Sequence, residues 1–466
     1  MTEGRISREL EQEFRSFLGT EGVSTDELDL VTYAYDGTRK NFPPWVIIWP
    51  TTTDQVARVM QIATRERIPV YPRGSGSGLT GGALAIEGGI LLSFERMNRI
   101  LEIDTANRTV TAQPGIFLGE LKEAVQAKGL FYPPDPASAK VASLGGTLAE
   151  CAGGLNCVKY GTTKDYVLAL EAVLANGDVI RVGSRARKSV SGYNLLQLLV
   201  GSEGTLAIVT EATLRLLPYP PYRCTFLASF DSVEDASNAV LAVLDGPVVP
   251  CALEFIDRVS LECVSAYIGT GEIPIVEAVL LGEVDGFDED AVYEDAKRVS
   301  AICLQNGART VRQAQDPEER ESLWELRRNL GPSMFLKGPF KHNEDIAVPL
   351  AESPRMLKEV YDIAAGHGVT AICFGHAGDG NLHVNFMTHS EDDPAVHSSI
   401  TEIFQRAVAR GGTISGEHGI GITKAEFFPL EWGERETDLM RRVKEVFDPL
   451  NILNPGKIFP ARGSGD

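Results

Sequence analysis

The chain has 466 residues, of which 43% are hydrophobic and 23% are charged, an ordinary composition for a globular protein. This length exceeds what one hydrophobic core usually organises, so we expect two or three domains. The formal net charge of −20 argues against a surface that binds nucleic acids or anionic membranes, because both need basic patches.

The N-terminal stretch MTEGRISRELEQEF lacks the apolar region of a signal peptide, and no run approaches the roughly 18 apolar residues of a membrane span. We therefore expect a cytoplasmic protein without a membrane span. The seven cysteines contain no C-x-x-C pair. A disulfide framework and an iron–sulfur cluster of the usual spacing are thus both disfavoured.

The first half of the chain alternates short strands with helices. Residues 5–19 have the pattern of a short amphipathic helix. Residues 50–73 predict an N-cap cluster, a helix and a strand that leads into a glycine loop, and the apolar helix positions are Val56, Val59, Met60 and Ala63. Further short strands and a helix over 117–129 follow, and the three prolines in LPYPPY (217–222) indicate a linker.

After this linker the pattern changes to strand, helix, strand, strand, helix, strand. The predicted ranges are strand 224–230, helix 232–244, strand 251–256, strand 275–284, helix 288–306 and strand 308–315. This order predicts a ferredoxin-like antiparallel sheet with helices on one face. A helix over 317–329 comes next.

The loop PRGSGSGLTGG (72–82) is glycine-rich, as phosphate-binding loops are. A Rossmann loop opens a helix, whereas here the helix precedes the strand and another strand follows the loop. Consecutive backbone N–H groups of such a loop can still surround a pyrophosphate. Taken alone, the glycine pattern is a weak signal, and a flexible surface loop is the alternative.

Three of the seven histidines lie in FGHAGDGNLHVNF (374–386) and SGEHGIG (415–421). The turn AGDGN between two apolar segments predicts a hairpin, which would bring His376 and His383 together on adjacent strands. With Glu417 they would form a His₂Glu set suited to zinc, with iron or manganese as alternatives. Packed or surface histidines are the competing interpretation.

Seven motifs together resemble one known family: PRGSGSGLTGGAL, PPDPAS, KYGTTKDYVLALEAVLANGDV, SGYNLLQLLVGSEGTLAIVTEATLRL, GHAGDGNLHVN, SGEHGIG and NPGKIF. Their order is similar to that in FAD-linked 2-hydroxy-acid dehydrogenases, a group that includes D-lactate dehydrogenase, D-2-hydroxyglutarate dehydrogenase and the flavoprotein subunit of glycolate oxidase. The resemblance spans residues 40–461.

The resemblance implies an α+β fold. An N-terminal helical segment (1–40) would precede a two-subdomain FAD-binding domain of the p-cresol methylhydroxylase type (41–220). A ferredoxin-like α+β cap domain with a C-terminal helical segment (221–461) would follow.

Cofactor contacts can be carried over motif by motif. The loop would hold the FAD pyrophosphate with Arg73, Gly74, Ser75, Gly76, Ser77, Gly78, Leu79 and Thr80. The rest of FAD would lie against Pro134, Asp135, Ser138, Gly145, Thr147, Gly154 and Ile208. Asn194 and Ala207 depart from the Asp and Gly that are usual in the family. Ala207 adds only a methyl group, which predicts a slightly altered flavin contact. The loop carries no histidine for covalent attachment, so we expect noncovalent FAD.

In the family, the positions of His376, His383 and Glu417 are often metal ligands, which supports the metal interpretation. A divalent ion would chelate the hydroxyl and carboxylate of a 2-hydroxy acid and lower the hydroxyl pKa. His418 would take the hydroxyl proton, and flavin N5 would accept hydride from Cα. The segment LWELRRN indicates Arg327 as the substrate-carboxylate ligand, with Arg328 as its rival, and Lys341 and Asn385 match substrate-contacting positions.

The sequence therefore predicts an FAD-dependent dehydrogenase of a D-2-hydroxy acid, with D-lactate or glycolate favoured and D-2-hydroxyglutarate as the alternative. Gly331 stands where one relative has a threonine near the substrate, so the sequence does not determine which 2-hydroxy acid is the substrate. Electrons would pass to an external partner, an iron–sulfur subunit or an electron-transfer flavoprotein. Remoter alternatives are a metal-dependent hydrolase without flavin and a noncatalytic electron-transfer flavoprotein.

Overall fold

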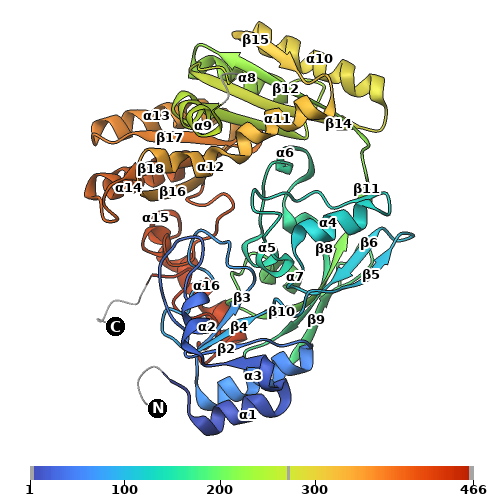
Figure 1. Cartoon of the computed structure of the whole chain (residues 1–466), viewed down its shortest axis with the longest axis vertical. Helices are drawn as coiled ribbons and strands as arrows, with labels where there is room; N and C mark the ends of the chain where they lie inside the picture. Colours follow the sequence, from blue (N-terminus) through green and yellow to red (C-terminus); the bar gives the residue numbers. More distant parts are fainter. Residues whose placement is uncertain (1–4, 270–272, 461–466) are drawn as a thin grey trace. The chain divides into compact units, whose positions relative to one another are not determined.

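A computed structural model describes residues 5–269 and 273–460 (Figure 1). The chain divides into two units. Of the described residues, the first comprises 5–152, 162–219 and 417–460, and the second comprises 153–161, 220–269 and 273–416. The predicted domain bounds at 40 and 220 stay predictions, and residues 417–460 cluster with the first unit.

The first unit contains a small mixed sheet in the order β1-β2-β4-β3. β3 and β2 both pair in parallel with β4, whereas β1 is antiparallel to β2. Helix α3 begins at the predicted N-cap, where Thr52 Oγ1 accepts a hydrogen bond from Gln55 N (3.3 Å). The elements are α1 Arg8–Leu18, β1 Val23–Ser24, α2 Glu27–Thr32, β2 Val46–Ile48, α3 Thr53–Glu66, β3 Val70–Arg73 and β4 Ile90–Ser93.

The predicted apolar positions of α3 are all buried, and they join residues of β2, β3 and β4 in one hydrophobic cluster. The period of the sequence pattern thus placed the correct helix face against the sheet. Since α3 precedes β3 and β4 follows the glycine loop, the arrangement differs from a Rossmann loop as predicted.

The first unit also contains a five-stranded antiparallel sheet in the order β5-β6-β10-β8-β9. β11, inside the predicted linker, pairs with β7, so the linker is shorter than its prolines suggest. The C-terminal residues return to the small sheet, where Leu453 bridges Val70 of β3. The elements are β5 Ile100–Asp104, β6 Thr109–Ala112, α4 Leu118–Gln126, β7 Leu130–Phe131, α5 Leu144–Glu150, β8 Val167–Val173, β9 Val179–Gly183, α7 Leu195–Leu199, β10 Ile208–Arg215, β11 Leu217–Pro218, α15 Phe428–Glu431 and α16 Glu434–Phe447.

The second unit is built on a seven-stranded sheet in the order β15-β12-β14-β13-β17-β18-β16, with every pairing antiparallel. The first four strands in this order have ferredoxin-like topology, as predicted. Its elements are α6 Cys157–Tyr160, β12 Tyr222–Phe230, α8 Val233–Leu244, β13 Ala252–Asp257, α9 Arg258–Ile268, β14 Ala278–Gly286, α10 Glu289–Gln305, β15 Ala308–Gln313, α11 Pro317–Arg328, α12 Leu330–Ser333, β16 Phe340–Ala347, α13 Ser353–Gly366, β17 Ala371–His376, β18 Asn381–Thr388 and α14 Pro394–Ala409.

Helices cover both faces of this sheet rather than the one face predicted. On one face, α9, α11 and α12 share a hydrophobic cluster with Leu227 and Leu281. On the other, α8 and α10 pack against β12 and β14, and a Cβ on Gly286 would meet Val292 of α10 at 2.8 Å. The nearly continuous apolar runs of β12 and β14, buried along almost their whole length, are typical of strands covered on both faces.

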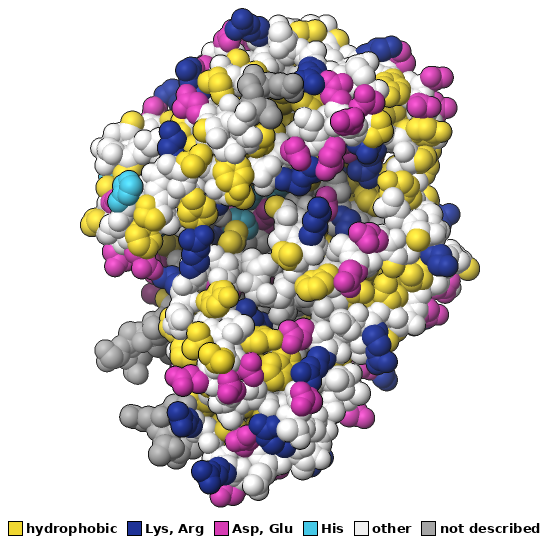
Figure 2. All heavy atoms as spheres, viewed as in Figure 1, with side chains coloured by type: hydrophobic (Ala, Val, Ile, Leu, Met, Phe, Trp, Pro, Cys, Tyr) yellow, Lys and Arg dark blue, Asp and Glu magenta, His cyan; other side chains and the backbone are white. Residues whose placement is uncertain are grey.

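No helix within residues 5–269 and 273–460 combines the length and apolar character needed to cross a membrane. Figure 2 shows Asp and Glu side chains interspersed with Lys and Arg on the face in view. On that face the basic side chains are therefore dispersed among acidic ones, in keeping with the negative net charge.

Candidate active site

The glycine loop of the first unit folds over the arginine that precedes it. Arg73 is 7% exposed, and its Nη1 has no hydrogen-bond partner among the described residues. A Cβ on Gly76, which has φ +72°, would lie 2.2 Å from Arg73 Nη2, and one on Gly74 would lie 2.1 Å from Ser143 Oγ. Gly76 favours glycine because its φ is positive and the Arg73 guanidinium lies against it, and at Gly74 a Cβ would have to displace the Ser143 hydroxyl.

The main-chain N–H groups of residues 75–79 make no hydrogen bonds within the part of the chain that the structure describes. These unpaired N–H groups and the buried Arg73 guanidinium are all hydrogen-bond donors, which suits an anionic group. The predicted loop residues Arg73, Gly74, Ser75, Gly76, Ser77, Gly78, Leu79 and Thr80 thus fit a pyrophosphate.

The remaining predicted FAD contacts lie on several elements. Lys122 Nζ donates to Pro134 O (3.1 Å) and pairs with Asp135, which together with Ser138 belongs to the turn after β7. Gly145 and Thr147 lie in α5, and Ile208, 2% exposed, opens β10. Gly154 belongs to the segment that clusters with the second unit. Their roles as cofactor contacts stay predictions.

Two polar residues near the C-terminus hold the far end of the glycine loop. Asn454 Nδ2 donates to Gly82 O (3.0 Å), and Lys457 Nζ donates to Gly81 O (2.9 Å) and Leu84 O (2.7 Å). Burial lowers the pKa of the Lys457 ammonium to about 8. The motif NPGKIF had contributed to the family resemblance, but its contact with the loop was not predicted.

His418 begins a segment that the first unit anchors through its main chain. Thr80 Oγ1 donates to His418 O (3.0 Å), and the buried Glu203 carboxylate accepts from Ile420 N (2.8 Å) and Gly421 N (2.7 Å). His418 Nε2 lies 4.0 Å from Glu417 Oε1. Glu203, whose pKa is raised by burial, was missed by the sequence reasoning.

In the second unit, β17 and β18 form the predicted hairpin, with Phe374 opposite His383 and His376 opposite Asn381. His376 and His383 are each 4% exposed, and their ring centroids lie 5.2 Å apart with the planes at 82°. The hairpin therefore brings the two imidazoles together, as predicted.

Behind His376 lies Glu254, a fully buried residue of β13 that the sequence reasoning did not identify. Its Oε1 lies 2.7 Å from His376 Nδ1, and its Oε2 accepts from Arg327 Nε at 2.6 Å. Burial alone would raise the pKa of the Glu254 carboxyl, but the charges and hydrogen bonds of His376 and Arg327 hold it below its usual value. A lone glutamate in the apolar strand CALEFI was the available signal.

The two rival arginines of α11 have different surroundings. Arg327 is 7% exposed, and its guanidinium carbon lies 4.7 Å from the centroid of the Phe374 ring. Arg328 is exposed and pairs with Glu321 at 2.6 Å. Arg327 is thus not a helix-surface charge, and it is the arginine linked to the histidine pair through Glu254.

Glu417 follows Gly416, whose main-chain N–H donates to Asp345 O of β16 at 3.2 Å. This hydrogen bond fixes Gly416 beside β16, the strand next to β18. The candidate ligand atoms of His376, His383 and Glu417 all lie within 4.8 Å of one another. Two imidazoles and one carboxylate at this spacing fit a divalent ion such as zinc.

The other two predicted substrate residues lie on β18 and β16. Asn385 is fully buried, and its Nδ2 donates to Ile372 O (3.2 Å) while its Oδ1 accepts from Asn343 Nδ2 (2.5 Å). Lys341 is half-buried and lies opposite Met387 in the pairing of the two strands. Because side chains alternate along a strand, residues 341, 383 and 385 share one face of the sheet.

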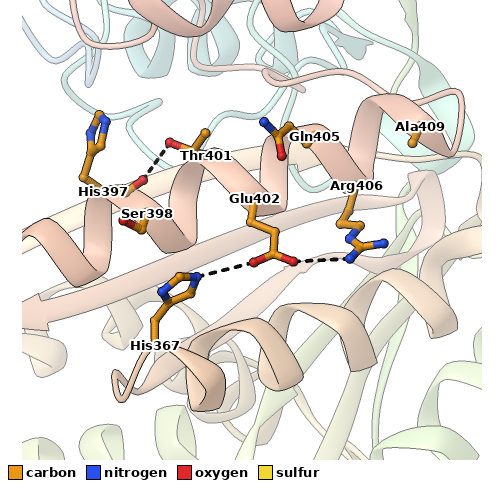
Figure 3. Close-up of a pocket in the computed structure, with 8 residues that line it drawn as sticks. All are labelled: His367, His397, Ser398, Thr401, Glu402, Gln405, Arg406 and Ala409. Carbon is orange, nitrogen blue, oxygen red and sulfur yellow. Dashed lines mark hydrogen bonds and ion pairs between the residues drawn. The ribbon is translucent and has the colours of Figure 1, made fainter.

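A separate cavity of about 510 Å³ lies on the second unit along α14 (Figure 3). Within it, Glu402 lies between His367 Nε2 (3.4 Å) and Arg406 Nη2 (3.3 Å). Its lining residues differ from the predicted site residues, and they are His367, His397, Ser398, Thr401, Glu402, Gln405, Arg406 and Ala409.

Comparison with known families matches both halves of the chain. Residues 219–458 match the C-terminal domain of FAD linked oxidases, and residues 44–183 match an FAD binding domain. Among curated proteins, the glycolate oxidase subunit GlcD of Bacillus subtilis (strain 168) is 41% identical over 458 residues, covering 97% of each chain. The D-lactate dehydrogenase of Archaeoglobus fulgidus is 38% identical over 422 residues, covering 89% of this chain and 91% of its own.

Among solved structures, p-cresol methylhydroxylase with substrate bound has a TM-score of 0.79 at 18% identity, covering 97% of this chain and 96% of its own. The 4-ethylphenol oxidase from Gulosibacter chungangensis has a TM-score of 0.77 at 20% identity, covering 99% of both chains. These likenesses confirm the predicted fold class of the p-cresol methylhydroxylase type.

Proposed function

The chain belongs to the family of FAD-linked oxidases, and we propose that this FAD-dependent oxidoreductase oxidises a D-2-hydroxy acid, D-lactate or glycolate, to the 2-oxo acid. One observation carries the proposal: a His₂Glu group with its ligand atoms within 4.8 Å lies beside an arginine that shares a buried glutamate with one of the histidines. A 2-hydroxy acid presents a carboxylate for the arginine and two oxygens that can chelate one cation.

The assigned groups would supply complementary chemistry. FAD accepts two electrons, and a divalent metal held by His376, His383 and Glu417 lowers the pKa of a hydroxyl that it binds. Arg327 binds the substrate carboxylate through the guanidinium nitrogens that Glu254 does not engage. Asn385 and Lys341 orient the substrate, and the His418 imidazole accepts the hydroxyl proton.

The names of the relatives support the substrate class, because two of them are named for glycolate and D-lactate. The first of these is named as a subunit, which supports an external electron acceptor such as an iron–sulfur subunit or an electron-transfer flavoprotein. We further propose that FAD is bound noncovalently, since the loop carries no histidine, and that the protein acts in the cytoplasm.

Anaerobic reduction of the flavin by a panel of D- and L-lactate, glycolate and D-2-hydroxyglutarate tests the proposal. We expect D-lactate or glycolate to bleach the flavin absorbance near 450 nm. Arg327→Met should raise the substrate concentration required for half-maximal bleaching by at least about 100-fold. Arg328→Met, on the adjacent exposed residue, is the matched control and should behave as wild type. A yellow protein that no hydroxy acid bleaches would contradict the proposal, and a colourless protein would favour the hydrolase.

The acceptor is tested on the same reduced protein. We expect slow reoxidation by air and by NAD and rapid reoxidation by dichlorophenolindophenol, because the only glycine-rich phosphate loop is assigned to FAD. Fast reoxidation by air would identify an oxidase, and direct reduction of NAD would exclude a dedicated partner.

A further inference from the structure

Glu254 is a fully buried charged group of the second unit to which the proposed chemistry assigns no direct role. It lies in the middle of β13, directly opposite His376 of β17, and its exposed fraction is 0%. Its two carboxylate oxygens have separate partners, His376 Nδ1 at 2.7 Å and Arg327 Nε at 2.6 Å. One side chain thus contacts both a proposed metal ligand and the proposed substrate arginine.

The contact with His376 determines which ring nitrogen faces the metal. An imidazole whose Nδ1–H is donated to a carboxylate presents Nε2 as its basic atom, and such carboxylate partners orient histidine ligands and raise their basicity. On the basis of this hydrogen bond, Glu254 fixes both the tautomer and the ring orientation of His376.

The contact with Arg327 determines which guanidinium nitrogens remain for substrate. Nε is bound by Glu254, and the Phe374 ring lies 4.7 Å from the guanidinium carbon. The two contacts fix the guanidinium plane while the Nη atoms stay available for a carboxylate, the geometry in which arginine binds carboxylates with two hydrogen bonds.

We propose that Glu254 is a positioning residue that fixes the spacing between the metal and the carboxylate-binding group, and so selects substrates whose carboxylate is directly attached to the hydroxyl carbon. This inference rests on the proposed function. A buried ion pair is seldom required for stability, because replacing both partners with apolar residues is often neutral. Glu254 is engaged on both oxygens by residues assigned to the reaction, which points to a role in positioning them.

The test compares Glu254→Gln with Glu283→Gln. Glu283 is a matched control because it is 5% exposed, lies on the neighbouring strand β14, and is also bound by an arginine, Arg223 at 3.0 Å. Glu254→Gln keeps one acceptor oxygen but replaces the other oxygen with an NH₂ donor. This donor cannot accept a hydrogen bond, so the contact with either His376 or Arg327 is lost.

Zinc affinity is measured without substrate, by competition with a chromophoric chelator, and KM and kcat are measured separately. For Glu254→Gln we expect zinc affinity to fall by about 10–100-fold and KM for D-lactate or glycolate to rise by at least about 10-fold, with FAD content unchanged. Glu283→Gln should leave zinc affinity and KM within threefold of wild type.

If Glu254→Gln does not fold, Glu254→Asp serves instead, because it keeps the charge but is too short for both partners. Zinc affinity and KM both within threefold of wild type in a folded Glu254 variant would overturn the inference, and so would equal losses in Glu283→Gln. If wild type itself binds no zinc and is bleached by no hydroxy acid, the proposed function fails first, and that result is visible without any variant.

Discussion

Lys457 offers a stability test of the C-terminal contact with the glycine loop. Its ammonium is 3% exposed and donates to two loop carbonyls, and burial lowers its pKa from 10.5 to about 8. Below pH 8 both the folded and the unfolded chain are protonated at this residue, so the folded state carries the full penalty of a buried charge. Between pH 8 and 10.5 only the unfolded chain keeps the proton, so the free energy of unfolding rises with pH.

The difference between 10.5 and about 8 corresponds to roughly 3 kcal/mol, since each pKa unit equals about 1.4 kcal/mol. Between pH 7 and 10.5 we expect the free energy of unfolding of wild type to rise by roughly this amount relative to that of Lys457→Met. The two lost hydrogen bonds add an offset that does not change with pH, because the neutral amine can still donate both.

Urea unfolding at a series of pH values, followed by circular dichroism, measures this difference. Lys128→Met, at an exposed lysine of the same unit, is the control and should follow the wild-type curve at every pH. If the curves of wild type and Lys457→Met stay parallel from pH 7 to 10.5, the buried-ammonium reasoning is wrong.

Three other substitutions test the cofactor, metal and base assignments. Gly74→Ala would place its Cβ 2.1 Å from Ser143 Oγ, so we expect reduced flavin content in the ratio of 450 to 280 nm absorbance, whereas Gly78→Ala, with nothing within 4 Å, should retain it. His383→Ala should lose about one metal ion per chain by elemental analysis; unchanged metal content and turnover would make the hairpin histidines structural. His418→Ala should slow flavin reduction by roughly 10²–10⁴-fold with normal FAD and metal content, and a rate within threefold of wild type would exclude it as the base.

Local patterns predicted the local structure well. The helix with Val56, Val59, Met60 and Ala63 was found because its apolar period of 3.6 residues and its N-cap agree. The hairpin that brings His376 and His383 together was found because a glycine-rich turn separates two apolar segments. In both cases the deciding residues lie within a few positions of one another.

Features that depend on distant contacts were missed. Helix α9 was also missed, although local signals for it exist: the Asp257 carboxylate accepts a hydrogen bond from Ser260 N at its start, and Gly269 ends it in the left-handed conformation. The hydrogen-bond partners of Glu254 are Arg327 and His376, which lie 73 and 122 positions away in the sequence. The bond from Asn454 to Gly82 joins residues 372 positions apart. A single sequence carries no local signal for such pairs.

The return of the C-terminal segment to β3 has a consequence for biosynthesis. Val70 N donates to Ile452 O and Val70 O accepts from Asn454 N, both at 2.7 Å, so one edge of the first sheet is completed by residues translated long after β3. During synthesis, residues 452–454 must leave the ribosome before this edge can close. A nascent or truncated chain that ends near residue 220 would expose β3 as an open edge, and premature termination should therefore lead to aggregation rather than to a free flavin-binding fragment.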